Sequence, residues 1–92
     1  MELKLQLADA MNTYSVALLV LKEKGYNIGI EPTEDDDDDE LGQWYADKDG
    51  RKFWAWDPLR LLGLVTLWEN RGDDWPLTDG EEDLFNKMIE PL

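Results

Sequence analysis

Seven consecutive acidic residues, from Glu34 to Glu40, divide this sequence into two parts. Like charges in a row repel one another and bury no apolar surface, so this run cannot belong to a hydrophobic core. We expect it to form a solvated, mobile loop at about residues 33–40. The segments on either side must therefore supply the fold, and residues 1–92 are expected to form a single domain.

The overall charge limits the kind of partner. The chain has 22 acidic and 9 basic residues, which give a formal net charge of −13. Such a chain repels the phosphates of nucleic acids and anionic lipid head groups. We therefore expect neither nucleic-acid binding nor membrane binding, and a basic protein is the partner that the charge favours.

The sequence also predicts a cytoplasmic location. It contains no cysteine, and it begins without a cationic leader followed by a long apolar stretch. The longest apolar run, Val16 to Leu21, is too short to cross a bilayer, because a membrane-spanning helix needs about 20 residues.

Two long segments are predicted to be helices. Apolar residues at spacings of three and four predict the first helix from about Leu5 to Lys24. The second should begin at Asp57–Pro58, since aspartate caps a helix and proline suits its first position. From Leu59 to about Asn70 this segment is almost entirely apolar, so we expect it to be buried on most of its circumference.

A third helix is predicted near the C-terminus. Thr78 and Glu81 have the spacing of a capping box, in which each side chain binds the other residue's backbone N–H. The residues that follow place four apolar side chains on one helical face: Leu84, Phe85, Met88 and Ile89.

Strands are predicted between the first two helices. Tyr26 to Ile30 has apolar residues at alternate positions, the period of a half-buried strand. Leu41 to Asp47 and Arg51 to Trp56 are aromatic-rich runs around an Asp-Gly dipeptide, which is typical of a hairpin turn. The expected fold is α+β, with order α-β-β-β-α-α and helices packed mainly on one face of a small three-stranded antiparallel sheet.

The register of the hairpin decides which aromatic side chains share a face. With Lys48 to Gly50 as the loop, Trp44 would face Trp54 and Tyr45 would face Phe53. One face would then carry Trp44, Trp54 and Trp56, and the other Tyr45, Phe53 and Ala55. Helices on one side only would leave an aromatic surface open, and such surfaces commonly mark contact sites.

Catalytic and metal-binding patterns are missing from the sequence. Without histidine or cysteine the chain lacks the usual general base near neutral pH and a thiolate nucleophile. A calcium loop starting at Asp36 would need glycine at its sixth position, which is Leu41. We therefore predict a protein that is not an enzyme and that has no cofactor and no specific metal site.

Three functional hypotheses remain open. The leading one is a protein-binding module, in the form of an acidic inhibitor or neutraliser of a basic partner. The alternatives are a self-associating domain that forms a homodimer and a weak divalent-cation binder that uses the acidic loop. The expected partner-binding residues are Trp44, Tyr45, Trp54, Trp56, Asp36, Asp37 and Asp38.

Overall fold

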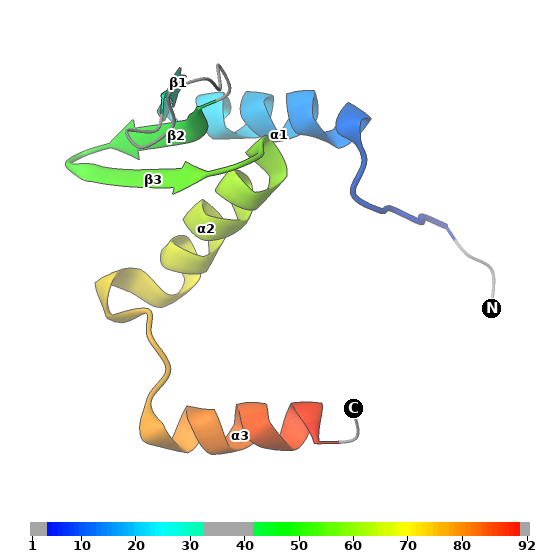
Figure 1. Ribbon diagram of the computed structural model, residues 1–92, viewed down its shortest axis with the longest axis vertical. Helices are drawn as coiled ribbons and strands as arrows, with labels where there is room; N and C mark the ends of the chain where they lie inside the picture. The colour runs from blue at the N-terminus through cyan, green and yellow to red at the C-terminus, as the bar shows by residue number, and fades with distance from the viewer. Residues whose placement is uncertain (1–3, 33–41, 91–92) are drawn as a thin grey trace.

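The computed structural model describes residues 4–32 and 42–90. Its elements follow the order that the sequence predicts (Figure 1). They are α1 (Met11–Glu23), β1 (Asn27–Glu31), β2 (Gln43–Lys48), β3 (Arg51–Ala55), α2 (Pro58–Arg71), the short 3-10 helix η1 (Gly72–Asp74) and α3 (Asp79–Ile89). The predicted α+β class is therefore confirmed, while the predicted acidic loop lies outside the described residues.

The three strands form an antiparallel sheet in the order β1-β2-β3. Asp49 and Gly50 alone form the turn between β2 and β3, with φ angles of 54° and 81°. Both residues lie in the left-handed region, as a two-residue hairpin turn of the favoured twist requires. Glycine adopts such angles without steric cost, which explains its place in the turn.

This turn changes the predicted register. Because the loop has two residues rather than three, Lys48 pairs with Arg51, Tyr45 with Trp54, and Trp44 with Ala55. A shift of one residue moves a side chain to the other face of a sheet. The predicted grouping of Trp44 with Trp54 is therefore wrong.

The hydrophobic core lies between one face of the sheet and the helices α1 and α2. Leu21 of α1 and Leu61 and Val65 of α2 are fully buried, together with Ala46 of β2. Tyr26 and Ala55 complete the buried cluster, and Ile28, Trp44, Phe53 and Leu62 pack around it. This arrangement confirms that helices cover one face of the sheet.

The first helix is shorter than predicted. Residues 4–10 are exposed and lie outside any helix or strand, and α1 begins only at Met11. Leu5 and Leu7 are 78% and 76% exposed, so the apolar spacing before Met11 has no core surface to cover. Short isolated helices are marginal in water, and the packing of α1 against α2 and β1 stabilises it.

The helix starts at Asp57 and Thr78 agree with the prediction. The Asp57 carboxylate accepts a hydrogen bond from the backbone N–H of Arg60 at 2.8 Å, and Thr78 and Glu81 form the reciprocal capping box. The predicted burial of α2 is wrong, however, because Leu64 and Leu67 are 41% and 42% exposed. Burial depends on what packs against a helix, and here the sheet and α1 cover only part of α2.

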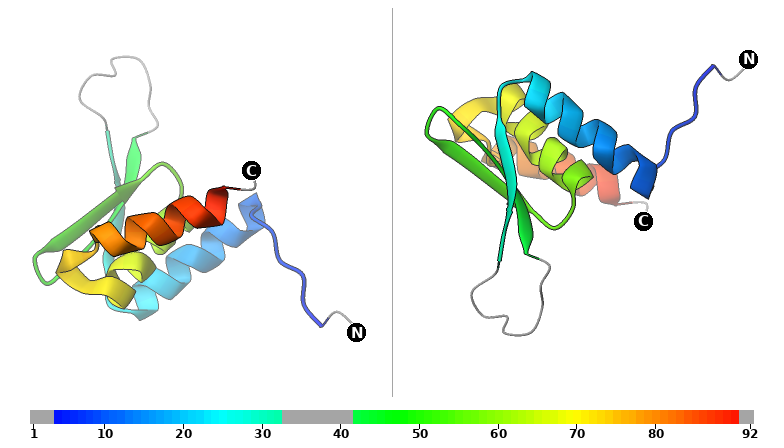
Figure 2. Two further views of the ribbon diagram at one scale, coloured as in Figure 1. Left: turned by 90° about the horizontal axis from the view of Figure 1, so that it is seen from below. Right: turned by 90° about the horizontal axis from the view of Figure 1, so that it is seen from above.

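The last helix stands apart from the rest of the protein. Figure 1 shows that α3 follows a short linker, residues 75–78, and lies away from the sheet, beyond the far end of α2, and in the view from below in Figure 2 α3 is the element nearest the viewer. Among its eleven residues, all of which the structure describes, none is buried. The apolar face predicted from the sequence is thus present on α3 and exposed.

Candidate functional site

Tyr45 and Trp54 lie next to each other on the face of the sheet opposite the core, which we call the outer face. Trp54 is 46% exposed, whereas Tyr45 is half-buried because its ring covers Gly29 on the neighbouring strand. A Cβ atom at Gly29 would come within 2.7 Å of the Tyr45 ring. The absence of a side chain at this position is therefore what lets the tyrosine ring lie over Gly29.

Charged side chains join these two rings. The Lys52 ammonium lies 4.5 Å from the centre of the Tyr45 ring and 5.3 Å from that of Trp54, close enough for cation–π attraction. Glu31 forms an ion pair with Lys52 and accepts a hydrogen bond from the Trp54 indole N–H at 3.0 Å. The hydrogen bonds from Lys52 and Trp54 lower the pKa of the Glu31 carboxyl. The outer face is thus an ordered aromatic and charged surface.

The other predicted contact residues have different positions. Trp44 is half-buried and packs against the core, on the opposite face from Trp54. Trp56, one residue beyond the end of β3, is 59% exposed. Asp36, Asp37 and Asp38 lie outside the described residues. The structure therefore brings Tyr45 and Trp54 together and separates Trp44 from them.

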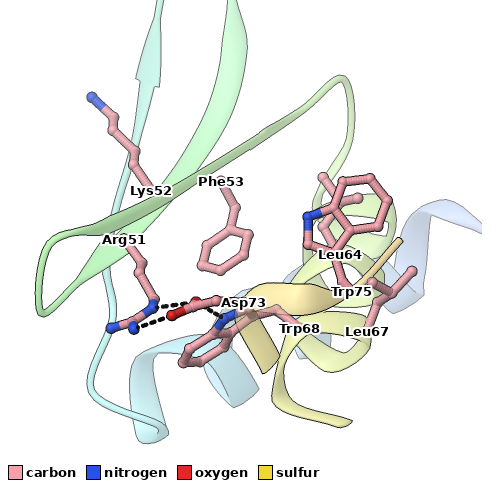
Figure 3. A pocket seen from close by; sticks show the side chains of 8 residues that line it. All are labelled: Arg51, Lys52, Phe53, Leu64, Leu67, Trp68, Asp73 and Trp75. Carbon is pink, nitrogen blue, oxygen red and sulfur yellow. Dashed lines mark hydrogen bonds and ion pairs between the residues drawn. The ribbon is translucent and has the colours of Figure 1, made fainter. Parts of the chain in front are cut away.

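A pocket of about 430 Å³ opens between β3, α2 and the segment that follows α2 (Figure 3). We call it the α2 pocket. Phe53 and the exposed leucines of α2 give it an apolar lining, and Trp75 closes one side. Its lining residues are Arg51, Lys52, Phe53, Leu64, Leu67, Trp68, Asp73 and Trp75.

An ion pair closes one end of the α2 pocket. Arg51 of β3 donates two hydrogen bonds to the Asp73 carboxylate, at 3.0 and 2.8 Å. The Trp68 indole N–H donates a third at 2.7 Å, and the Arg51 guanidinium lies 4.8 Å from the centre of the Trp68 ring. These bonds hold the pKa of Asp73 at about 2, far below its ordinary value, chiefly because Arg51 stabilises the carboxylate. The sequence does not predict this contact, because its two charged residues are 22 positions apart.

Arg71 fixes the linker between α2 and α3. Its guanidinium donates hydrogen bonds to the backbone carbonyls of Trp75 at 2.7 Å and Pro76 at 3.2 Å. It also forms an ion pair with Glu81 in the first turn of α3, at 2.7 Å. The Glu81 carboxylate accepts hydrogen bonds from Arg71 and from the backbone N–H of Thr78, and these bonds hold its pKa at about 2, below its ordinary value. The direction in which α3 leaves the body of the protein is thus set by four contacts of one side chain.

The apolar face of α3 is the largest group of exposed apolar side chains on one element. Leu84 and Met88 are 62% and 75% exposed, and Phe85 and Ile89 are 45% and 41% exposed. The spacing of the apolar residues in the sequence predicts this face, but it does not predict that the face is exposed. Amphipathic helices normally cover their apolar side, so this face is a candidate contact surface.

Two further features were looked for among the described residues. Within residues 4–32 and 42–90, no group of three or more acidic residues is placed to hold a metal ion. No helix in these ranges is both long and apolar enough to cross a membrane. No protein-family model, curated protein or solved structure matches the chain.

Proposed function

We propose that this protein is a non-enzymatic protein-binding module that recognises a basic protein, in the manner of an acidic inhibitor or neutraliser. The observation that carries the proposal is the exposure of Trp54 and Trp56, 46% and 59%, on a chain with a net charge of −13. Tryptophan supplies a large share of the energy of protein interfaces when a partner buries it. Net charge of one sign attracts an oppositely charged partner and speeds its association.

The outer face suits such a contact because its central side chains are already held in place. Tyr45 is fixed over Gly29, and Trp54 is fixed by its hydrogen bond to Glu31. Side chains that are ordered before binding lose less conformational entropy when a partner covers them. On the same face, Asp47 lies opposite Lys52 in the strand register and two residues along β2 from Tyr45, so it adds an acidic group for a basic side chain of the partner next to the Glu31–Lys52 pair.

The test is capture of binding proteins on the immobilised chain at low and at moderate salt. We expect one basic protein to be retained in stoichiometric amount, and we expect salt to weaken its retention. Trp54→Ser with Trp56→Ser should abolish retention, while Leu19→Ser, a matched loss of an exposed apolar side chain on α1, should not. Equal retention by both variants would contradict a contact through these tryptophans.

The acidic residues provide a second, kinetic test. Replacing Asp36, Asp37 and Asp38 by asparagine removes three charges and leaves the side-chain size unchanged. If charge steers association, this variant should bind the captured partner with a slower association rate and a weaker salt dependence. An unchanged rate at low salt would mean that the charge serves only solubility.

A further inference from the structure

We propose that Glu31, Tyr45 and Trp54 of the outer face form a binding site for an arginine side chain of the basic partner, and that Lys52 occupies this site in the free protein. The inference rests on the proposed function and adds to it the chemical group that the outer face recognises. It follows from the position of the Lys52 ammonium group among these side chains.

The Lys52 ammonium group has the contacts of a bound cation. It lies 4.5 Å from the centre of the Tyr45 ring and 5.3 Å from that of the Trp54 ring, and it pairs with the Glu31 carboxylate. Aromatic faces and carboxylates are the groups that recognise ammonium and guanidinium ions in proteins. The outer face therefore holds a site for a cation, and a side chain of the same chain fills it.

The path of the Lys52 side chain indicates what attracts the cation. Asp47 lies directly opposite Lys52 in the register of β2 and β3. Lys52 nevertheless reaches across β2, over the Tyr45 ring, to Glu31 of β1, and it points away from Phe53 and the α2 pocket (Figure 3). An acid was available directly across the strand, so the ring face and Glu31 together determine where the ammonium group lies.

The site can exchange one cation for another because it does not depend on Lys52. The side chains of Lys52 and Glu31 are 32% and 41% exposed, so water screens their attraction and the pair costs little to break. Trp54 donates its hydrogen bond to Oε1 of Glu31, whereas Lys52 binds Oε2. Tyr45 lies in the space that Gly29 leaves open. Both rings and the carboxylate thus keep their own contacts when Lys52 moves away.

An arginine of the partner can form more contacts at this site than Lys52 does. A guanidinium group is planar, stacks on aromatic rings, is less strongly hydrated and presents more N–H donors than an ammonium group. Asp47 lies on the same face, two residues along β2 from Tyr45, and supplies a second carboxylate next to the Glu31–Lys52 pair. The aromatic rings and the neighbouring acids therefore favour arginine over lysine.

Competition with Lys52 would make the contact selective. A single basic side chain must displace Lys52 and so gains little affinity. A partner that also buries Trp54 and Trp56 gains contact energy that an arbitrary basic protein lacks. Lys52 thus limits the attraction of a chain with a net charge of −13 for basic proteins in general.

Titration with Nα-acetylarginine amide at constant ionic strength tests the site without a partner protein, with the NMR signal of the Trp54 indole N–H as the readout. Lys52→Gln should bind this probe about tenfold more tightly than the wild type, because the competing ammonium group is gone. Lys24→Gln is the matched control. It removes the same charge from the Lys24–Glu69 pair, whose side chains are 38% and 33% exposed, and should leave the affinity unchanged. Equal effects of the two substitutions would show that only net charge matters and would overturn the site.

Two further titrations identify the groups that bind. Glu31→Gln in the Lys52→Gln chain keeps an oxygen for the Trp54 indole but removes the charge, and it should abolish binding of the probe. Unchanged binding would overturn the role of Glu31. Nα-acetyllysine amide should bind Lys52→Gln more weakly than the arginine probe does, and equal binding would overturn the preference for a guanidinium group. Circular dichroism checks that each variant keeps the fold.

The outcome for the site is distinguishable from the outcome for the proposed function. If the titrations fail while a basic protein is still captured in a salt-sensitive way, the arginine site is wrong and the proposed function stands. If the probe binds as expected but no basic protein is captured, the proposed function is wrong and the cation site stands.

Discussion

Arg51 and Asp73 join β3 to the 3-10 helix after α2 through two hydrogen bonds, of 3.0 and 2.8 Å. The same carboxylate accepts the indole N–H of Trp68, so one acid connects three elements around the α2 pocket. The side chains of Arg51 and Asp73 are 42% and 67% exposed, and water screens their attraction. The role of the pair is therefore to set the geometry of the pocket wall more than to stabilise the fold.

The Arg51–Asp73 contact predicts a pH dependence. The pKa of Asp73 is about 2 in the folded protein and close to its ordinary value of about 3.9 in the unfolded chain. A carboxyl group whose pKa is lowered by folding stabilises the folded protein at pH values above its pKa in the unfolded chain. This contribution is lost as the pH falls toward its pKa in the folded protein. The free energies of unfolding of the wild type and Asp73→Asn, measured in urea, should therefore differ above about pH 4 and become equal near pH 2. A constant difference across this range would contradict the lowered pKa.

Two leucines of α1 should respond very differently to truncation. Leu21 is fully buried, whereas Leu19, on the same helix, is 61% exposed. Leu21→Ala should lower the free energy of unfolding by about 2–5 kcal/mol, because it removes buried apolar area and leaves a cavity. Leu19→Ala should lower it by less than about 1 kcal/mol. Chemical denaturation of both variants measures the difference. Equal losses of stability would contradict the packing of α1 against the core through Leu21.

The surroundings of Gly29 and Gly63 predict opposite effects on stability when each glycine is replaced by alanine. Gly29→Ala would put a Cβ atom 2.7 Å from the tyrosine ring, displace it and weaken its contact with Lys52. We expect the free energy of unfolding to fall by about 1–3 kcal/mol. Gly63 lies in α2 with open space at its Cβ position, and Gly63→Ala should stabilise by up to about 1 kcal/mol. Thermal unfolding of the two variants measures these opposite effects. In a Tyr45→Ser background, Gly29→Ala should lose most of its destabilising effect.

The contacts of Arg71 should control the accessibility of the linker. Arg71→Gln removes the ion pair with Glu81 and the geometry that holds both linker carbonyls. Limited proteolysis should then cut between Trp75 and Thr78 faster than in the wild type. Lys87→Gln, which removes the positive charge of α3 without touching the linker, should leave the cleavage rate unchanged. If both variants are cut equally, the linker is not fixed by Arg71.

Local signals predicted the elements well because their causes lie within a few residues. Asp57 and Thr78 cap helices that start where the sequence predicts, since a cap needs only the backbone N–H groups of the next turn. The Asp49-Gly50 turn likewise appears where expected. The register of the hairpin was predicted wrongly by one residue, because the dipeptide does not by itself distinguish a two-residue loop from a three-residue loop.

The sequence by itself thus determined the acidic charge, the α+β class, the order of the elements and the apolar face of α3. Only the tertiary structure decided which of these surfaces are covered. It placed Trp44 against the core and Trp54 on the outer face, and it left Leu64 and Leu67 exposed. Periodicity shows that a helix or strand has an apolar side, but burial depends on whether a distant segment packs against it. For α3, no described residue of its own chain covers the apolar face.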